Sequence, residues 1–246
     1  MQVSQLLITC INANLLLLNS KQSMNQGKVI IIGASGHAKV IKDIFEQQKL
    51  YQIWGFIDAT KQIGESFLNY PILGTEESIP QIISNQHGDI YLFIAIGDNF
   101  IRNQIAERIS KKIPGIKFAT AIHPSAQIAS DVAIGEGTAI MAGVIINPCS
   151  TIGKFVILNT RCSVDHDNLI GDFSSMAPNS TTGGNVELGH FSALSISASI
   201  KHGIKVGNHT VIGGGAFVNK HLPDNCVAYG IPAKNIRTRT PGERYL

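Results

Sequence analysis

Aliphatic residues recur at every sixth position through the second half of this chain. The series runs from residue 116 to residue 218, and a single position, Thr182, departs from it. A period of six fits neither the 3.6-residue turn of a helix nor the two-residue alternation of a strand. The sequence is therefore a hexapeptide repeat. Its aliphatic positions are Ile116, Ile122, Ile128, Ile134, Ile140, Ile146, Ile152, Leu158, Val164, Ile170, Met176, Leu188, Leu194, Ile200, Val206, Ile212 and Val218.

One buried side chain per hexad requires a backbone that turns after each short strand. Three hexads make one coil of a triangular parallel β-helix, with coils stacked about 4.8 Å apart. We expect the aliphatic residues to form columns inside this helix over residues 118–222, with small residues near its corners. Periodicity alone does not fix the hand of the coil. A β-helix that serves only as a spacer or a binding surface is the alternative at this stage.

Composition indicates a protein of two domains that does not bind nucleic acid. The chain has 246 residues, only 15% of them charged, and a formal net charge of +3. Neither value indicates a basic surface for DNA or RNA. The four cysteines have no metal-ligand spacing and no disulfide framework, so we interpret them as free thiols in a reducing cytoplasm. They are Cys10, Cys149, Cys162 and Cys226.

The two ends of the chain stand apart from the rest. Residues 1–27 contain a short apolar stretch with no positive charge before Lys21, which fits neither a signal peptide nor a membrane span. Met24 directly precedes the first convincing strand, so our hypothesis is that translation starts there and that the preceding residues are an upstream extension, not native to the protein. Residues 223–246 are expected to form a C-terminal tail. Its basic side chains either meet phosphates or lie in solvent; they are Lys234, Arg237, Arg239 and Arg244.

Between these regions, residues 28–117 alternate buried strands with helices, which is typical of a small Rossmann-like α/β domain. About ninety residues suit one mononucleotide-binding half rather than a full dinucleotide site. The expected strands are 28–33, 52–58 and 90–97, and the expected helices are 37–49, 76–84 and 99–112.

A glycine-containing loop, GASGH, joins the first of these strands to its helix. Ser35, Gly36 and His37 lie where backbone amides at a helix start favour a phosphate. Asp58 ends the second strand, where such folds place a carboxylate on a ribose or base, and Gly97 ends the third strand on the same edge. A tight structural turn is the alternative interpretation of the glycines. An NAD enzyme is disfavoured because the third glycine of the dinucleotide motif is missing.

The segment 159–171 carries the residues suited to catalysis. His166 falls two places after a buried position, so it projects outward, and Asp167 follows it. A neutral imidazole is suited to take a proton from an attacking amine or hydroxyl, and the carboxylate would orient the ring and raise its basicity. Gly184 lies one coil further on, and we expect it to leave room for an acetyl group beside the base. His202, two coils from His166, is the rival base.

Several motifs together resemble a known family. IIIGASGHAKVIKD, GFID, PILGT, AIGDN, the hexapeptide repeat and a terminal YGIPAK closely resemble the sugar O-acyltransferases and nucleotide-sugar N-acetyltransferases, a family that includes sialic acid O-acetyltransferases and UDP-4-amino-sugar acetyltransferases. The resemblance covers nearly the whole chain from Met24 onward. It implies a left-handed β-helix, a departure from the usual right-handed crossover. It also implies His166 as base, Asp167 as its partner and His37 as a contact of the nucleotide sugar.

The resemblance implies acetyl-CoA as acyl donor, with no metal, and bacterial surface glycan synthesis as the setting. Matching contacts for the donor are Ser175, Gly184, Ile196 and Gly214; several relatives carry a histidine at the position of Ser175. It further implies a cytoplasmic homotrimer with active sites between subunits. We expect N-acetylation of a nucleotide-linked amino sugar, with O-acetylation of sialic acid or a related sugar as the alternative. A sugar nucleotidyltransferase is disfavoured because its nucleotide domain would be longer.

Overall fold

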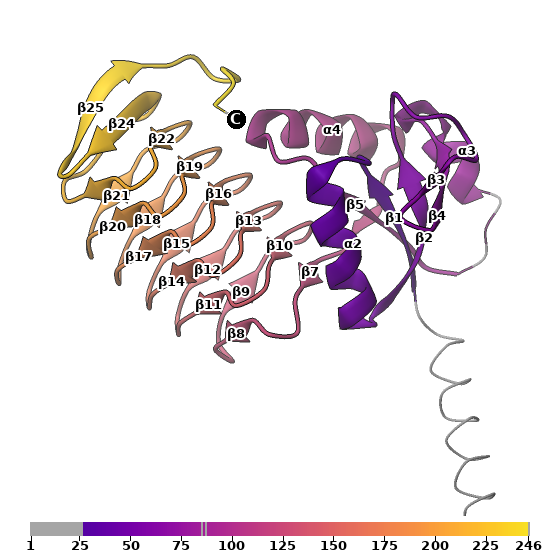
Figure 1. Ribbon diagram of the computed structural model, residues 1–246, viewed down its shortest axis with the longest axis horizontal. Coiled ribbons are helices and arrows are strands. Elements are labelled where there is room, and N and C mark those ends of the chain that lie inside the picture. Colours follow the sequence, from indigo (N-terminus) through magenta and orange to yellow (C-terminus); the bar gives the residue numbers. More distant parts are fainter. Residues whose placement is uncertain (1–26, 85, 87, 246) are drawn as a thin grey trace, which may run out of the picture.

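The computed structural model describes residues 27–84, 86 and 88–245. The expectation of an N-terminal extension falls on residues 1–26, which lie outside the described residues. Figure 1 shows an α/β domain packed against one end of a long coil of short strands. No helix among the described residues is long and apolar enough to cross a membrane.

The N-terminal domain is built on a mainly parallel sheet with the order β3-β4-β2-β1-β5-β6. The predicted strands and helices are all present within a few residues. Strands β3 and β4, an antiparallel pair, were not expected from the sequence. The elements are β1 (Gly27–Ile32), α2 (Gly36–Gln48), β2 (Tyr51–Ile57), β3 (Ser66–Phe67), β4 (Tyr70–Gly74), η1 (Glu76–Ser78), α3 (Ile79–Ser84), β5 (Ile90–Ile94), α4 (Asn99–Lys112) and β6 (Lys117–Phe118).

The hexapeptide region forms a triangular parallel β-helix, in which each strand pairs with the strand eighteen residues further on, as in Ala139 with Ile157. Its first face contains β7 (Ala121–Ile122), β10 (Ala139–Ile140), β13 (Ile157–Leu158), β16 (Ser175–Met176), β19 (Ala193–Leu194) and β22 (Val211–Ile212). Its second face contains β8 (Gln127–Ile128), β11 (Ile145–Ile146), β14 (Ser163–Val164), β17 (Thr181–Thr182), β20 (Ser199–Ile200) and β23 (Phe217–Val218). Its third face contains β9 (Ala133–Ile134), β12 (Thr151–Ile152), β15 (Leu169–Ile170), β18 (Glu187–Leu188) and β21 (Lys205–Val206).

The interior of the β-helix matches the sequence periodicity. From Ile140 onward, every aliphatic member of the series is buried, and most of the small residues between them are buried as well. Ile116, the first member of the series, does not belong to the β-helix. It precedes β6, which pairs with β5, and it packs in the core of the N-terminal domain. A second column of rings, Phe155, Phe173, Phe191 and His209, stacks at the corner between the third and first faces.

The two domains share apolar cores. Helix α2 and the first face pack together through small outward side chains, including Ala121 and Ala139, both fully buried. On the other side of the sheet, α4 and β6 pack against Phe155 of the ring column. Small side chains allow a helix to approach a sheet closely, so the N-terminal domain is held firmly on the β-helix.

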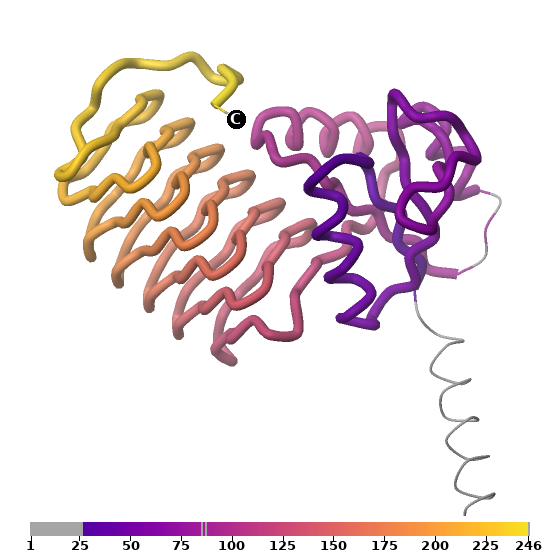
Figure 2. The backbone as a smooth tube through the Cα atoms, in the orientation of Figure 1, coloured from indigo at the N-terminus to yellow at the C-terminus, as the bar shows by residue number. Residues whose placement is uncertain are grey.

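In the segment 223–246, which we expected to form a tail, the described residues 223–245 are largely structured. Strand β24 (Cys226–Gly230) extends the first face and pairs in antiparallel register with β25 (Ala233–Thr238). The chain then returns towards the start of α4, as the tube in Figure 2 shows. Arg239 is buried and donates to the carbonyl oxygen of His209 at 2.9 Å, so this basic residue is neither in solvent nor free for a phosphate.

Candidate active site

The predicted site residues fall at three places in one chain. The first is a cavity of about 260 Å³ between the domains, which we call the inter-domain cavity. It brings together His37 and Gly97 from the N-terminal domain with Ser175 and Ile196 from the first face and its following corner. Tyr245, which the sequence did not suggest, also lines it. Four of the predicted site residues, separated by up to 159 positions in sequence, thus share one cavity.

His37 occupies the first turn of α2. Burial, with a smaller contribution from the charge of Arg102, lowers the pKa of His37 to about 4. Its Nε2 atom is shielded from solvent and has no hydrogen-bond partner. A buried nitrogen without a partner is uncommon, and at a cavity wall it is available to a bound ligand. The imidazole is neutral at physiological pH.

The two glycines of the GASGH loop differ in their surroundings. Gly33 has φ +99, and a side-chain carbon there would lie 2.9 Å from Ile96 Cδ1 and 3.1 Å from the Ala95 carbonyl oxygen. Gly33 is therefore required by the turn itself. A side-chain carbon at Gly36 would meet no atom within 4 Å, and the side chain of Ser35 makes no capping bond to the helix. The space above Gly36 is consequently open to a ligand.

Asp58 lies at a second cavity, of about 280 Å³, which also contacts Gly33 and Arg108. Its carboxylate accepts hydrogen bonds from the amides of Ala34 at 2.9 Å and Thr60 at 2.9 Å. Burial opposes ionisation, but these bonds outweigh it and hold the pKa of Asp58 below its ordinary value. The carboxylate therefore fixes the GASGH loop, a role that the sequence interpretation did not include.

The third place is the corner between the second and third faces, where His166 and Asp167 form a pair. His166 Nδ1 lies 2.7 Å from Asp167 Oδ2, and the two side chains are 53% and 50% exposed. The hydrogen bond that His166 donates to the Asp167 carboxylate is the main reason that the pKa of His166 is raised. Because Nδ1 of the neutral ring donates to the carboxylate, the lone pair lies on Nε2. His166 is thus set up to accept a proton at Nε2.

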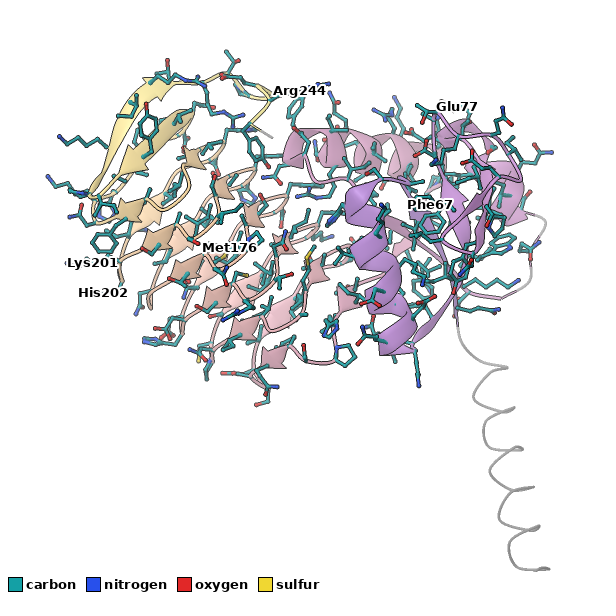
Figure 3. All side chains as sticks on the ribbon, viewed as in Figure 1. Phe67, Glu77, Met176, Lys201, His202 and Arg244 are labelled. Carbon is teal, nitrogen blue, oxygen red and sulfur yellow. The ribbon has the colours of Figure 1, made fainter. Side chains whose placement is uncertain are left out.

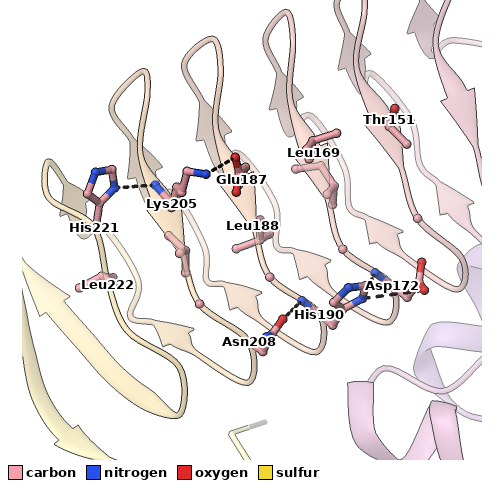
Figure 4. A pocket seen from close by; sticks show the side chains of 16 residues that line it. Thr151, Leu169, Asp172, Glu187, Leu188, His190, Lys205, Asn208, His221 and Leu222 are labelled. Atoms are coloured by element: carbon pink, nitrogen blue, oxygen red, sulfur yellow. Dashed lines mark hydrogen bonds and ion pairs between the residues drawn. The ribbon is translucent and has the colours of Figure 1, made fainter.

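Two other histidines in the β-helix, His190 and His221, have the opposite tautomer. Nδ1 of His190 accepts from the Asp172 amide, and Nδ1 of His221 accepts from the Lys205 amide, each at 2.9 Å. Their neutral rings must carry the proton on Nε2, which leaves no lone pair for base catalysis. Both line a groove of about 700 Å³ on the third face (Figure 4), and none of the predicted site residues lines it.

Gly184 lies directly beneath the imidazole of His166. A side-chain carbon at Gly184 would lie 2.5 Å from His166 Cε1 and 2.6 Å from Nε2. The space expected for an acetyl group is therefore taken by the His166 ring itself, which corrects our reason for singling out this glycine. His202 lies two coils further along and projects at the edge of the β-helix (Figure 3).

Two polar residues inside the coil hold this corner, and the sequence analysis missed both roles. Asn168 is fully buried, and its Nδ2 donates to the carbonyl oxygens of Asp165 at 2.6 Å and His166 at 3.2 Å. Thr182, the exception in the aliphatic series, accepts from the Asp165 amide at 3.3 Å. An asparagine in a column of small residues and a threonine in a column of aliphatic ones are the signals that mark this corner.

The described residues contain no group of three or more His, Cys, Asp or Glu side chains that could hold a metal ion. Their cysteines, Cys149, Cys162 and Cys226, are free thiols. Cys10 lies outside the described residues.

Comparison with known proteins identifies the family. Residues 28–109 match the PglD N-terminal domain. The chain is 33% identical to UDP-N-acetylbacillosamine N-acetyltransferase of Bacillus subtilis over 46% of its own length and 51% of that protein. It is 31% identical to GDP-perosamine N-acetyltransferase of Escherichia coli O157:H7 over 61% of its length and 69% of that protein. The chain belongs to this family of nucleotide-sugar N-acetyltransferases.

Solved structures give the same result over more of the chain. A histidine-to-alanine mutant of the GDP-perosamine N-acetyltransferase of Caulobacter crescentus, in complex with CoA and GDP-perosamine, matches with a TM-score of 0.80 and 35% identity over 85% of this chain and 96% of that one. The acetyltransferase domain of PglB from Neisseria gonorrhoeae, in complex with acetyl coenzyme A, matches with a TM-score of 0.76 and 29% identity over 86% and 100%. The β-helix is therefore the left-handed form, and the chain is an acyltransferase.

In this enzyme the His166 corner does not face the inter-domain cavity. The cavity lies on the first face and its corner with the second face, whereas His166 follows β14 at the corner between the second and third faces. The His166–Asp167 pair and the inter-domain cavity of a single chain are therefore on different edges of the triangular coil.

Proposed function

We propose that the enzyme transfers the acetyl group of acetyl-CoA to the amino group of an amino sugar linked to a nucleoside diphosphate. The observation that carries the proposal is the His166–Asp167 pair, with its free Nε2 lone pair and a 2.7 Å hydrogen bond on Nδ1. Transfer to an amine needs a group that accepts one proton as the new bond forms, and this pair provides it.

The two cavities at the GASGH loop support a nucleotide-linked acceptor. Ile96 lines the cavity at Asp58 and the adjacent Gly97 lines the inter-domain cavity, so the two hollows lie on either side of one loop. Each is slightly smaller than a usual ligand pocket of about 300–1,000 Å³. We assign the nucleoside to the cavity at Asp58, the diphosphate to the open space at Ser35 and Gly36, and the sugar to the inter-domain cavity.

The donor is assigned to the corner that follows the first face. Ser175 on β16 lines the inter-domain cavity, and Ile196, which is 59% exposed, follows β19 in the next coil. Gly214 lies one coil beyond Ile196, and a side-chain carbon placed on it would lie 3.4 Å from the Ile196 carbonyl oxygen. These residues form a strip of apolar and small groups that suits the pantetheine arm. The thioester would then lie at the Ser175 end, beside the acceptor sugar.

The base comes from a second copy of the chain in this proposal. His166 and the inter-domain cavity lie on different edges of one coil, so neighbouring copies in a homotrimer would bring the two edges together. Exposed apolar side chains on the second and third faces support such packing: Ile145 is 45% exposed, Leu169 52% and Phe217 37%. Gly184 beneath the ring then helps to place the base rather than the donor.

The reaction follows from these assignments. The amine nitrogen attacks the thioester carbonyl carbon, and its proton passes to Nε2 of His166 while Asp167 stabilises the imidazolium. The tetrahedral intermediate collapses with cleavage of the carbon–sulfur bond. The departing CoA thiolate takes the proton from Nε2, which restores the neutral imidazole. We place this reaction in the cytoplasm because the described cysteines are unpaired, which suits a reducing compartment.

The experiment is an acetyl-transfer assay with acetyl-CoA and a panel of UDP-, GDP-, dTDP- and CMP-linked amino sugars, with free sialic acid as the O-acceptor. Release of CoA thiol gives the rate, and mass spectrometry identifies the product. An amide product resists hydroxylamine, whereas an O-acetyl ester is cleaved by it. Transfer to sialic acid alone, with an ester product, would replace this proposal by the O-acetyltransferase alternative.

A further inference from the structure

The last residues of the chain form a strap that reaches back across the molecule. Residues 239–245, which we call the C-terminal strap, follow β25 at the far end of the β-helix and end beside the start of α4 (Figures 1 and 2). The strap therefore connects the last coils with the N-terminal domain, and it ends at the inter-domain cavity.

Several contacts fix the path of the strap. Arg239, 7% exposed, donates to the carbonyl oxygens of His209 and Glu243. The Glu243 carboxylate pairs with Arg237 at 2.6 Å, which ties the strap to β25. Gly242 has φ +82, and a side-chain carbon there would lie 2.9 Å from the ring of Phe100 in α4. A buried arginine and a glycine in close contact indicate a defined position rather than a loose end.

The strap places Tyr245 at the inter-domain cavity. Its side chain lines the inter-domain cavity with His37, Gly97 and Ser175. Its hydroxyl oxygen lies 3.4 Å from Ser175 Oγ, beyond the usual 2.5–3.0 Å of an O–H···O bond. The Tyr245 oxygen also accepts from the backbone amide of Asn99, so the capacity that remains on Tyr245 is chiefly that of its O–H donor. Neither hydroxyl is saturated by the other at this distance. Burial raises the pKa of Tyr245, so its hydroxyl remains a neutral donor and acceptor at physiological pH.

The cavity has the composition of a site for one small polar ring. Its wall is mainly apolar, with Met176, Leu194 and Ile196, and its polar groups are few. The unpartnered Nε2 of His37 and the hydroxyls of Ser175 and Tyr245 reach it from three separate segments. A few converging polar groups on an apolar wall are typical of small-molecule sites, and several unsaturated donors and acceptors suit a ring with hydroxyl groups.

We propose that Tyr245 is a substrate-contacting residue: its ring closes the inter-domain cavity, and its hydroxyl, together with Ser175, binds a hydroxyl group of the acceptor sugar. The C-terminal strap is then part of the acceptor site and not only a clamp between domains. This inference rests on the proposed function, because it assigns a sugar to that cavity.

The test compares Tyr245→Phe and Tyr245→Ala with the wild-type chain. Removing one hydrogen bond in Tyr245→Phe should raise the KM and the dissociation constant for the nucleotide sugar about 3–10-fold. Tyr245→Ala, which also opens the wall, should raise both further. The KM for acetyl-CoA and the melting temperature of Tyr245→Phe should stay near wild type. Tyr229→Phe, at a tyrosine that is 51% exposed on β24, is the matched control and should behave as wild type.

Calorimetric binding of the nucleotide sugar is measured beside turnover, so that the two proposals fail separately. An active wild type whose Tyr245→Phe variant keeps both acceptor constants overturns the role of Tyr245 and leaves the proposed function intact. A lower acceptor KM in Tyr245→Ala means that the side chain obstructs the site, which also overturns it. A wild type that neither binds nor acetylates any nucleotide sugar of the panel overturns both.

Discussion

Arg102 on α4 is the strongest single connection between the two domains. Its side chain is 1% exposed, and its guanidinium donates to oxygen atoms of both domains. Burial lowers the pKa of Arg102 to about 10, so the group is still charged at pH 7. Its six acceptors are the carbonyl oxygens of Ile96, Gly97, Phe155, Phe173 and Ser174 and the amide oxygen of Asn99, at 2.8–3.4 Å.

Arg102→Met keeps an apolar stem but removes every one of these donors. A buried acceptor left without a partner costs about 1–3 kcal/mol, and five backbone carbonyls lose a donor. Part of this cost is offset because the variant no longer buries a charge, whose desolvation costs several kcal/mol. If about three carbonyls stay dry, we expect a net loss of about 3–5 kcal/mol. At about 2–4 °C per kcal/mol for a chain of this size, the melting temperature should fall by about 6–20 °C.

Denaturant titration and calorimetry measure this loss. Arg108→Met is the matched control, because Arg108 lies on the same helix and pairs with Glu76 at 2.8 Å, but its side chain is 51% exposed. An exposed ion pair contributes about 0–1 kcal/mol to the free energy of unfolding, so Arg108→Met should change that free energy little. A loss in Arg102→Met no larger than in Arg108→Met would refute the reasoning, since it would mean that the buried bonds between the domains contribute no net stability.

Further predictions concern the proposed site. His166→Ala should lower kcat by about 10²–10⁴ with little change in either KM, while His202→Ala stays near wild type in the same steady-state assay; an active His166→Ala enzyme would place the base elsewhere. Because Asp167 raises the pKa of His166, the acidic limb of the pH–rate profile should lie above the ordinary value of 6.5 and move to lower pH in Asp167→Asn. Gly36→Val should raise the acceptor KM without loss of stability, because a side chain there meets no protein atom; unchanged acceptor kinetics would remove the phosphate from this loop. Because folding lowers the pKa of His37 from 6.5 to about 4, the unfolded chain binds more protons than the folded chain between pH 6.5 and 4. The free energy of unfolding should therefore fall by up to about 3 kcal/mol as the pH is lowered through this range. Denaturant titrations of His37→Gln should show a smaller fall.

Local sequence determined the repeating parts of this protein. The period of six predicted the coils and their interior, and the predicted helix 99–112 coincides with α4. The third strand was predicted to reach residue 97 but ends at Ile94. The Ala95 amide still donates to Ile32 of β1, but residues 96–98 leave the sheet, and the carbonyl oxygens of Ile96 and Gly97 accept from Arg102 instead. A tertiary contact thus changed the end of an element whose existence the sequence had indicated.

The sequence also indicated the chemistry of the site but not its assembly. His166 and Asp167 are neighbours in the chain, so their pairing follows from local geometry alone. The meeting of His37, Ser175 and Tyr245 at one cavity depends on how α2 docks on the first face and on where the strap returns. The sequence period and the motifs predict only how residues a few positions apart are arranged, because both depend on the local conformation of the backbone. Contacts between segments more than a hundred residues apart leave no such period, and only the packed structure decides them.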